Sequence, residues 1–239
     1  MHESAWGRLI AVLVSPARTF ESIAARPTWA APLIVLMILS TAGGVLAWQR
    51  VDVDQIKRNT AEAMEKRGQP AGEEQLEQIA GVSKGVGMGC SVVIPPIAYL
   101  ISALVLWAAF RIAGGEIGFK SSFSVTLHGM MPWAIYALLA IPVVLAQKEI
   151  DPQVLQAQTL VASSPASFMA TDTGPVLLAL LGSFDVFSFW TIALLTIGFS
   201  IAAGVKRGTA AATVILAWLF WIAVKLALAW VGSAFGGAG

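Results

Sequence analysis

Long apolar runs separated by short polar segments dominate the pattern along the chain. Five runs, at residues 28–48, 87–110, 123–146, 184–205 and 209–231, have about the 20 residues that a helix needs to cross a membrane. Only helices and closed barrels satisfy their backbone polar groups in lipid, and the short alternating strands typical of a barrel do not occur. The pattern therefore predicts an all-α, polytopic membrane helix bundle with five transmembrane helices spanning 28–231.

The longest polar segment, 49–86, lies between the first two runs. It predicts two polar helices broken at the stretch RGQPAG, and Glu62 precedes Lys66 by four residues, a favourable spacing on an exposed helix. We expect a solvated helical hairpin loop outside the bilayer. A docking surface on the same loop is the alternative.

The N-terminal segment, 1–27, predicts a short amphipathic helix. Ser15 is placed to cap it and Pro16 suits its first position. Phe20 and Ile23 fall on one face, and basic residues lie mostly on the other. Such a helix lies flat in the cytoplasmic interface or packs under the bundle, and the sequence leaves both open. A short tail, 232–239, follows the last run.

Composition supports a membrane protein and excludes several other classes. The chain is 57% hydrophobic and 12% charged, whereas soluble domains carry about 25% charged residues. A net charge of +1 provides no field that would attract nucleic acid, so no nucleic-acid partner is expected. Cys90 is the only cysteine and the chain has two histidines, so we expect no metal site and no cofactor.

Lysine and arginine on alternate loops predict the orientation. The side with the N terminus carries Arg8, Arg18, Arg26, Arg111, Lys120, Lys206 and Arg207. The opposite side carries only Lys148 in the third loop and none in the tail, which predicts a cytoplasmic N terminus and a C terminus outside. The six lysines and arginines of loop 49–86 oppose this orientation, and we give the short loops more weight.

The second and third runs contain residues that bend a helix or introduce polarity. Pro95 and Pro96 lie in the second run and Pro132 in the third, and each removes a helical hydrogen bond. His128 lies near the start of the third run. We expect a neutral histidine bonded to a neighbouring helix, with a proton relay as the alternative.

Two opposite charges interrupt the last two runs, which form an antiparallel hairpin. Counting from residue 207, Asp185 lies 22 residues back and Lys225 lies 18 residues forward, so their depths differ by about 6 Å. A lysine side chain can reach across most of that gap. We expect Asp185 and Lys225 to form a structural ion pair, and a helix break at Gly182 and Ser183 just before it.

Three stretches resemble the bacterial branch of the YIP family, which is named for Ypt/Rab-interacting proteins. They are SPARTFESIAARPTWAAPL (15–33), RIAGGEIGFKSSFSVTLHGMMPW (111–133) and FDVFSFWTIALLTIGFSIAAGVKRGTA (184–210). The resemblance implies five spans in a bacterial cytoplasmic membrane. Eukaryotic members contact Rab-type GTPases, but about 27 residues before the first span are too few for a comparable domain, so this sequence does not support a GTPase partner.

We expect a non-enzymatic scaffold or adaptor that oligomerises or binds other membrane proteins. Membrane lipids are its other expected partners. Small residues such as Gly43, Gly44, Gly85, Gly89 and Gly129 would permit close helix contacts. A transporter or lipid-handling protein of the scramblase kind, using the kinked second and third spans with His128 as a polar gate, is the alternative. An intramembrane enzyme ranks last, since no nucleophile and base can be placed at matching depth.

Overall fold

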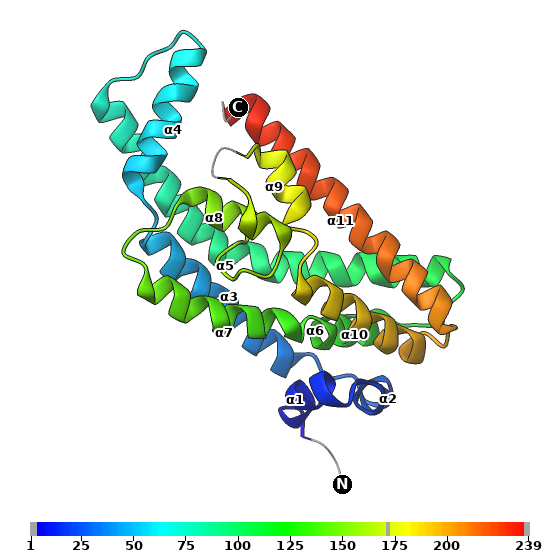
Figure 1. Ribbon diagram of the computed structural model, residues 1–239. Helices are drawn as coiled ribbons and strands as arrows, with labels where there is room; N and C mark the ends of the chain where they lie inside the picture. Colours follow the sequence, from blue (N-terminus) through cyan, green and yellow to red (C-terminus); the bar gives the residue numbers. More distant parts are fainter. Residues whose placement is uncertain (1–3, 171–172, 237–239) are drawn as a thin grey trace. The chain divides into compact units, whose positions relative to one another are not determined.

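The computed structural model describes residues 4–170 and 173–236, which are helical over most of their length. The helices, in chain order, are α1 (Gly7–Val14), α2 (Pro16–Ala25), α3 (Ala30–Gln49), α4 (Val53–Lys66), α5 (Glu73–Ile112), α6 (Phe119–Gly129), α7 (Met131–Ala146), α8 (Pro152–Ala157), the 3₁₀ helix η1 (Pro165–Phe168), α9 (Pro175–Leu181), α10 (Val186–Ala202) and α11 (Arg207–Gly236) (Figure 1). Among the described residues the only β-type pairing is an isolated bridge between Val51 and Ile150. The all-α prediction is confirmed.

Length and composition identify the helices that can cross a membrane. Four stretches qualify by themselves, namely Ala30–Gln49, Glu73–Ile112, Phe119–Ala146 and Arg207–Ser233. The pair α9 and α10 qualifies when taken together, and its two helices are bent by 49° at the break between them. The described part of the chain thus provides four or five membrane-spanning helices, which confirms a polytopic bundle.

Helix α5 is longer than the second apolar run. It continues for 40 residues from Glu73 to Ile112, so the second polar helix of loop 49–86 and the following span are one helix. Between Glu73 and the apolar run the sequence contains no proline, and its glycines do not end the helix. The chain breaks only at residues 67–72, where Gly68 adopts a φ of 71° and Pro70 follows.

The third run consists of α6 and α7, which meet at Met130. Pro132 lies in the first turn of α7, where its missing N–H leaves the His128 carbonyl without the usual helical donor. The N–H of Met130 donates instead to the carbonyl oxygens of Thr126 and His128. The interruption therefore coincides with Pro132, whereas Pro95 and Pro96 lie inside α5.

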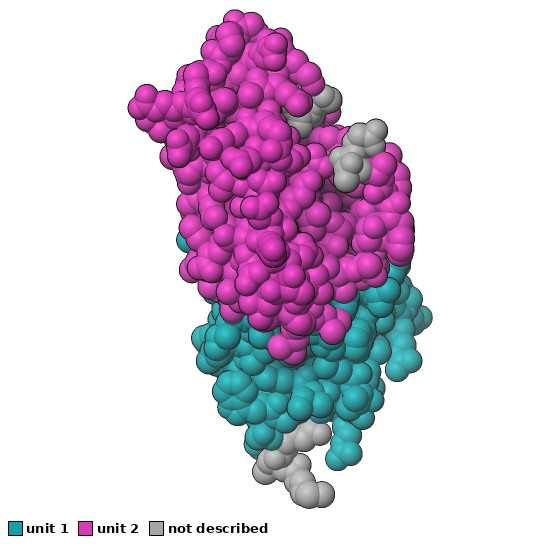
Figure 2. Space-filling view, turned by 60° about the vertical axis from the view of Figure 1, so that its left-hand side comes forward, with its two compact units in different colours: residues 1–40, 93–137, 186–221 teal, residues 41–92, 138–185, 222–239 magenta. Residues whose placement is uncertain are grey.

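The chain divides into two compact units, shown in different colours in Figure 2. Unit 1 comprises residues 1–40, 93–137 and 186–221, and unit 2 comprises residues 41–92, 138–185 and 222–239. Unit 1 contains the larger apolar core, to which α1, α2, α6 and α10 all contribute. The rings of Phe110 and Phe199 stack there, with centroids 4.4 Å apart and planes inclined by 7°.

The N-terminal helices pack within unit 1. Phe20 and Ile23 of α2 are completely buried, and α2 lies against α10 and α6. Gly198 of α10 makes this approach possible, because a Cβ there would come within 2.8 Å of the Phe20 ring. Ser15 precedes α2 as expected, but its side chain makes no capping hydrogen bond. Of the two alternatives for this helix, the structure favours packing on the bundle. Helix α1 had no counterpart in the sequence prediction.

Unit 2 has a smaller core formed by Ala47, Val144 and Ile150. The Val51–Ile150 bridge holds its loops together, since the N–H of Ile150 donates to the carbonyl oxygen of Arg50 (2.7 Å) and the N–H of Asp52 donates to that of Ile150 (2.9 Å). Next to this bridge, Asp52 caps α4. The bridge thus fixes the point where α4 begins.

Candidate functional site

Helix α6 places polar side chains in the core of unit 1. Ser122, Ser124, Thr126 and His128 are all completely buried. Ser122 donates a hydrogen bond of 3.0 Å to the carbonyl oxygen of Ala103, so this hydroxyl is satisfied. The Ser124 and Thr126 hydroxyls and His128 Nε2 are enclosed and have no hydrogen-bond partner among the described residues. A buried polar atom without a partner is costly, which makes this helix the first place to look for a site.

His128 is oriented by its own helix. Its Nδ1 lies 2.8 Å from the carbonyl oxygen of Ser124, one turn earlier, so Nδ1 carries the hydrogen and donates it. The sequence had led us to expect a partner on a neighbouring helix, and that expectation was wrong. The bond leaves Nε2 as an acceptor in the neutral imidazole.

Arg8 of α1 is the charged residue that sequence reasoning missed. The sequence pattern uses Arg8 only as a signal of membrane orientation, yet just 7% of this residue is exposed. Its Nη1 donates to the carbonyl oxygen of Arg26 (3.0 Å) and to Thr28 Oγ1 (3.1 Å), and it interacts electrostatically with His128. A signal was available, because Arg8 precedes the buried Val12 by four residues and so shares its helix face.

Asp185 and Lys225 belong to unit 2. Asp185, which immediately precedes α10, is 5% exposed, and Lys225 of α11 is half-buried. The two side chains interact electrostatically. The structure therefore places the two residues close enough to interact electrostatically. The ion pair itself stays a prediction. Gly182 stands at the break before them, where a Cβ would come within 2.7 Å of the Ala157 carbonyl oxygen.

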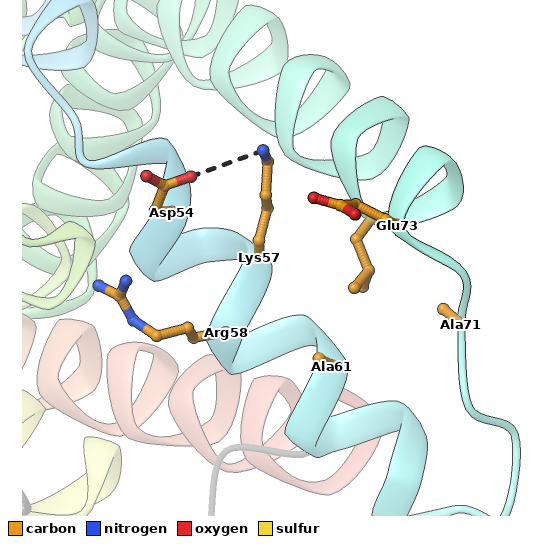
Figure 3. A pocket seen from close by; sticks show the side chains of 7 residues that line it. Asp54, Lys57, Arg58, Ala61, Ala71 and Glu73 are labelled. Carbon is orange, nitrogen blue, oxygen red and sulfur yellow. Dashed lines mark ion pairs between the residues drawn. The ribbon is translucent and has the colours of Figure 1, made fainter.

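An open groove lies between α4 and the start of α5 (Figure 3). It has a volume of about 520 Å³ and is lined by Asp54, Lys57, Arg58, Ala61, Ala71, Glu73 and Leu76. Lys57 Nζ lies 3.5 Å from a carboxylate oxygen of Asp54, and Glu73 extends toward α4 from the opposite wall. The groove is mixed in charge and wide open, so it selects no particular ligand. The described residues also contain no group of three or more His, Cys, Asp or Glu side chains that could bind a metal ion.

One side of α5 in unit 2 is built from exposed glycines. Gly81, Gly85 and Gly89 recur every four residues, and a Cβ on any of them would meet nothing within 4 Å. Another side of the same helix packs tightly within the chain. There a Cβ on Gly87 would overlap the indole ring of Trp48, and one on Gly44 would come within 2.7 Å of Ser91. We call Gly81, Gly85 and Gly89 the glycine face. The sequence had indicated two of its three members.

Comparison with known proteins agrees with this architecture. The Yip1 domain family matches residues 10–230, and a similar protein is "Membrane protein YknW" of Bacillus subtilis (strain 168). The two sequences are 27% identical over 199 residues, which cover 83% of this chain and 80% of that protein. No solved structure matches the chain. With its membrane-spanning helices and a family match over nearly its whole length, the chain is an integral membrane protein that belongs to the Yip1 domain family.

Proposed function

We propose that the chain is a non-enzymatic membrane scaffold that associates with a transmembrane helix of another protein, most simply a second copy of itself. The observation that carries this proposal is the glycine face of α5. Its three glycines are exposed and face open space, although the same helix uses other small residues to pack against its neighbour in the chain.

Gly89 lies in the apolar run 87–110, and Gly81 and Gly85 lie on the turns of α5 just before it, so the glycine face crosses the boundary of the expected span. Inside the membrane, helix association depends on close packing, because lipid tails are as apolar as the side chains that they contact. Glycine lets two backbones approach, and a spacing of four residues keeps the glycines on one side of the helix. Val82 and Val86 follow the first two glycines and are also exposed, 65% and 58% respectively. The stiff, branched valines form a ridge on the helix surface, and the glycines form a groove beside it. A second helix with the same pattern can place its ridge in this groove.

Contacts inside the chain show how this helix associates. Gly87 receives the Trp48 ring and Ser91 lies against Gly44, so α5 packs on α3 through its small residues. The glycine face repeats that chemistry on a different side. It also avoids charge, since Lys84 is the only charged residue between Glu77 and Arg111, and its Nζ donates to the carbonyl oxygen of Gln49 at the end of α3.

The test compares full-length proteins carrying a leucine at one glycine. Two differently tagged copies are expressed together, extracted in mild detergent, and recovered through one tag. We expect the second tag to co-purify with the wild-type chain and with Gly43→Leu, a control glycine of α3 that also faces open space. With Gly85→Leu the second tag should no longer co-purify, because the leucine side chain fills the space beside the glycines where the partner helix would pack.

A cysteine crosslink identifies the partner. In a Cys90→Ser background the chain has no native thiol, so Val86→Cys can be crosslinked in intact membranes. An adduct of twice the chain's mass indicates a second copy, and any other mass indicates a different protein. Adducts and co-purification that persist unchanged in Gly85→Leu would show that the glycine face is not the contact.

The transporter or lipid-handling alternative has its own measurement. Purified protein is reconstituted into vesicles, and the movement of a fluorescent phospholipid between leaflets is followed. A rate equal to that of empty vesicles is the result expected for a scaffold. Lipid movement that Gly85→Leu leaves intact would replace the scaffold with that alternative.

A further inference from the structure

We infer that Arg8 anchors a phosphate-binding site in unit 1, at the place where α1 packs against α6. The site uses the free edge of the Arg8 guanidinium together with polar atoms of Ser124 and His128 on α6, the helix against which α1 packs. It is independent of the glycine face, which belongs to unit 2.

The bonds of Arg8 fix its guanidinium and leave one edge unused. Nη1 donates both hydrogen bonds, to the carbonyl oxygen of Arg26 and to Thr28 Oγ1, which tie α1 to the segment that follows α2. Nε is enclosed and has no acceptor among the described residues, and Nη2 has none there either. The Nε and Nη2 hydrogens form the fork with which arginine binds two oxygens of a phosphate or carboxylate.

The described residues provide no compensating charge for Arg8. Among the residues that the structure describes, no carboxylate lies within ion-pairing distance of this guanidinium. Burial of a cation without an anion is strongly destabilising, because the charge loses its hydration and gains no opposite charge in return. An anion at the free fork would remove that cost. Phosphate, which offers several oxygens and a negative charge, fits the fork better than a neutral ligand.

The neighbouring helix provides further polar atoms. Helix α1 packs against α6, and Arg8 interacts electrostatically with His128. Ser124 lies one turn before His128, so both occupy the same side of α6. The Ser124 hydroxyl can donate to a phosphate oxygen, and Nε2 can accept a hydrogen from a protonated phosphate oxygen or a headgroup hydroxyl. Both atoms are enclosed and unpaired in the described structure.

The outer side of the helix that carries Arg8 is apolar. Helix α1 turns Arg8 inward and exposes Trp6, Ile10 and Val14, so its outer side is apolar. In an integral membrane protein such a side enters the lipid near the headgroups. We take the phosphate to come either from an anionic phospholipid headgroup or from the free ion.

The experiment measures binding to the full-length protein, purified in a non-ionic detergent and freed of native lipid. The probes are dihexanoyl phosphatidylglycerol, inorganic phosphate, and dihexanoylglycerol, which has the same short chains but no phosphate. Each is titrated while the unfolding temperature and the bound mass are followed. Arg8→Lys keeps the charge but removes the fork, and Arg18→Gln is the matched control because Arg18 is exposed on the adjacent helix.

Wild type and Arg18→Gln should bind the phosphate-containing probe with the same affinity. Arg8→Lys should weaken binding by at least about tenfold, since lysine cannot make the paired charge-assisted hydrogen bonds of the fork, and Ser124→Ala should weaken it by roughly 2- to 10-fold. Because Ser124→Ala leaves the guanidinium in place, it keeps the test valid even where an Arg8 variant fails to fold.

The outcomes separate the two sources of phosphate. Arg8-dependent binding of phosphatidylglycerol alone identifies a lipid headgroup, and Arg8-dependent binding of inorganic phosphate identifies the free ion. The proposal would be overturned if dihexanoylglycerol raised the unfolding temperature as much as the phosphate-containing probes do. It would also be overturned if wild type, Arg8→Lys and Ser124→Ala bound those probes with equal affinity. Folded wild-type protein that binds neither phosphate probe would overturn it as well.

Discussion

The Arg50 guanidinium donates a hydrogen bond of 3.1 Å to the carbonyl oxygen of Leu145, near the end of α7. It also donates to the Gln147 carbonyl oxygen, just beyond that helix. Lys84 makes the equivalent contact at the end of α3, where its Nζ lies 2.8 Å from the Gln49 carbonyl oxygen. Cations at the carbonyl ends of helices satisfy unpaired acceptors and oppose the helix dipole. Two basic residues of the loop 49–86 are therefore structural.

Replacing Arg50 should destabilise unit 2. Arg50→Met removes both bonds and exposes two acceptors, and we expect a loss of about 1–3 kcal/mol. A lower unfolding temperature in detergent measures it. Arg18→Met, on an exposed residue, should have little effect. Equal stability of the two variants would show that Arg50 contributes nothing to the fold.

The two small-residue sides of α5 should respond differently to a larger side chain. Gly87→Leu forces the Trp48 ring to move, so it should lower the unfolding temperature. Gly81→Leu faces open space and should leave the unfolding temperature of the monomer unchanged. Similar losses in both variants would mean that glycine itself, rather than its surroundings, matters along this helix.

Charge reversal tests the Asp185–Lys225 ion pair. Asp185→Lys and Lys225→Asp should each destabilise the detergent-extracted protein, because each brings like charges together at a partly buried place. The double variant restores opposite charges and should regain part of the loss. If the loss of stability in the double variant equals the sum of the losses in the two single variants, the side chains do not pair.

Helix α2 should be part of the folded core rather than a separate surface anchor. Phe20→Ala leaves a cavity beside Gly198 and Val125, and we expect a loss of about 3–5 kcal/mol. Phe168→Ala is the control, since that ring is 81% exposed. An unfolding temperature that Phe20→Ala does not lower would place α2 outside the cooperative unit.

The orientation remains a prediction that thiol labelling can decide. In a Cys90→Ser background, Gln69→Cys marks the turn after α4 and Lys206→Cys marks the turn before α11. An impermeant maleimide should label Gln69→Cys in intact spheroplasts, and Lys206→Cys only after permeabilisation. The reverse pattern would place the N terminus outside.

The sequence predicts those features that depend on neighbouring residues. Apolar runs locate the spans because lipid imposes a length of about 20 residues, and Gly182 and Ser183 predict the bend before α10. Helix α5 was divided in the prediction because hydrophobicity locates the bilayer and not the end of a helix. A helix can leave the membrane without ending, and no residue between Glu73 and the apolar run stops α5.

Contacts between distant residues had no local signal. Arg50 and Leu145 are 95 positions apart, so no periodicity indicates that one holds the other. For Arg8 the spacing to Val12 indicates burial, but no local pattern indicates that its Nη1 donates to the carbonyl oxygen of Arg26 and to Thr28 Oγ1. Sequence reasoning identified His128 from its polarity in an apolar run, but not its electrostatic interaction with Arg8.

The turn between α4 and α5 has a practical use in structure determination. Both helices keep their regular geometry up to residues 66 and 73, so a soluble helical protein can be fused there in helical register with two attachment points. Exposed turns tolerate such insertions well. The fusion would give a small membrane protein a large, recognisable marker outside the detergent micelle, by which single images could be aligned.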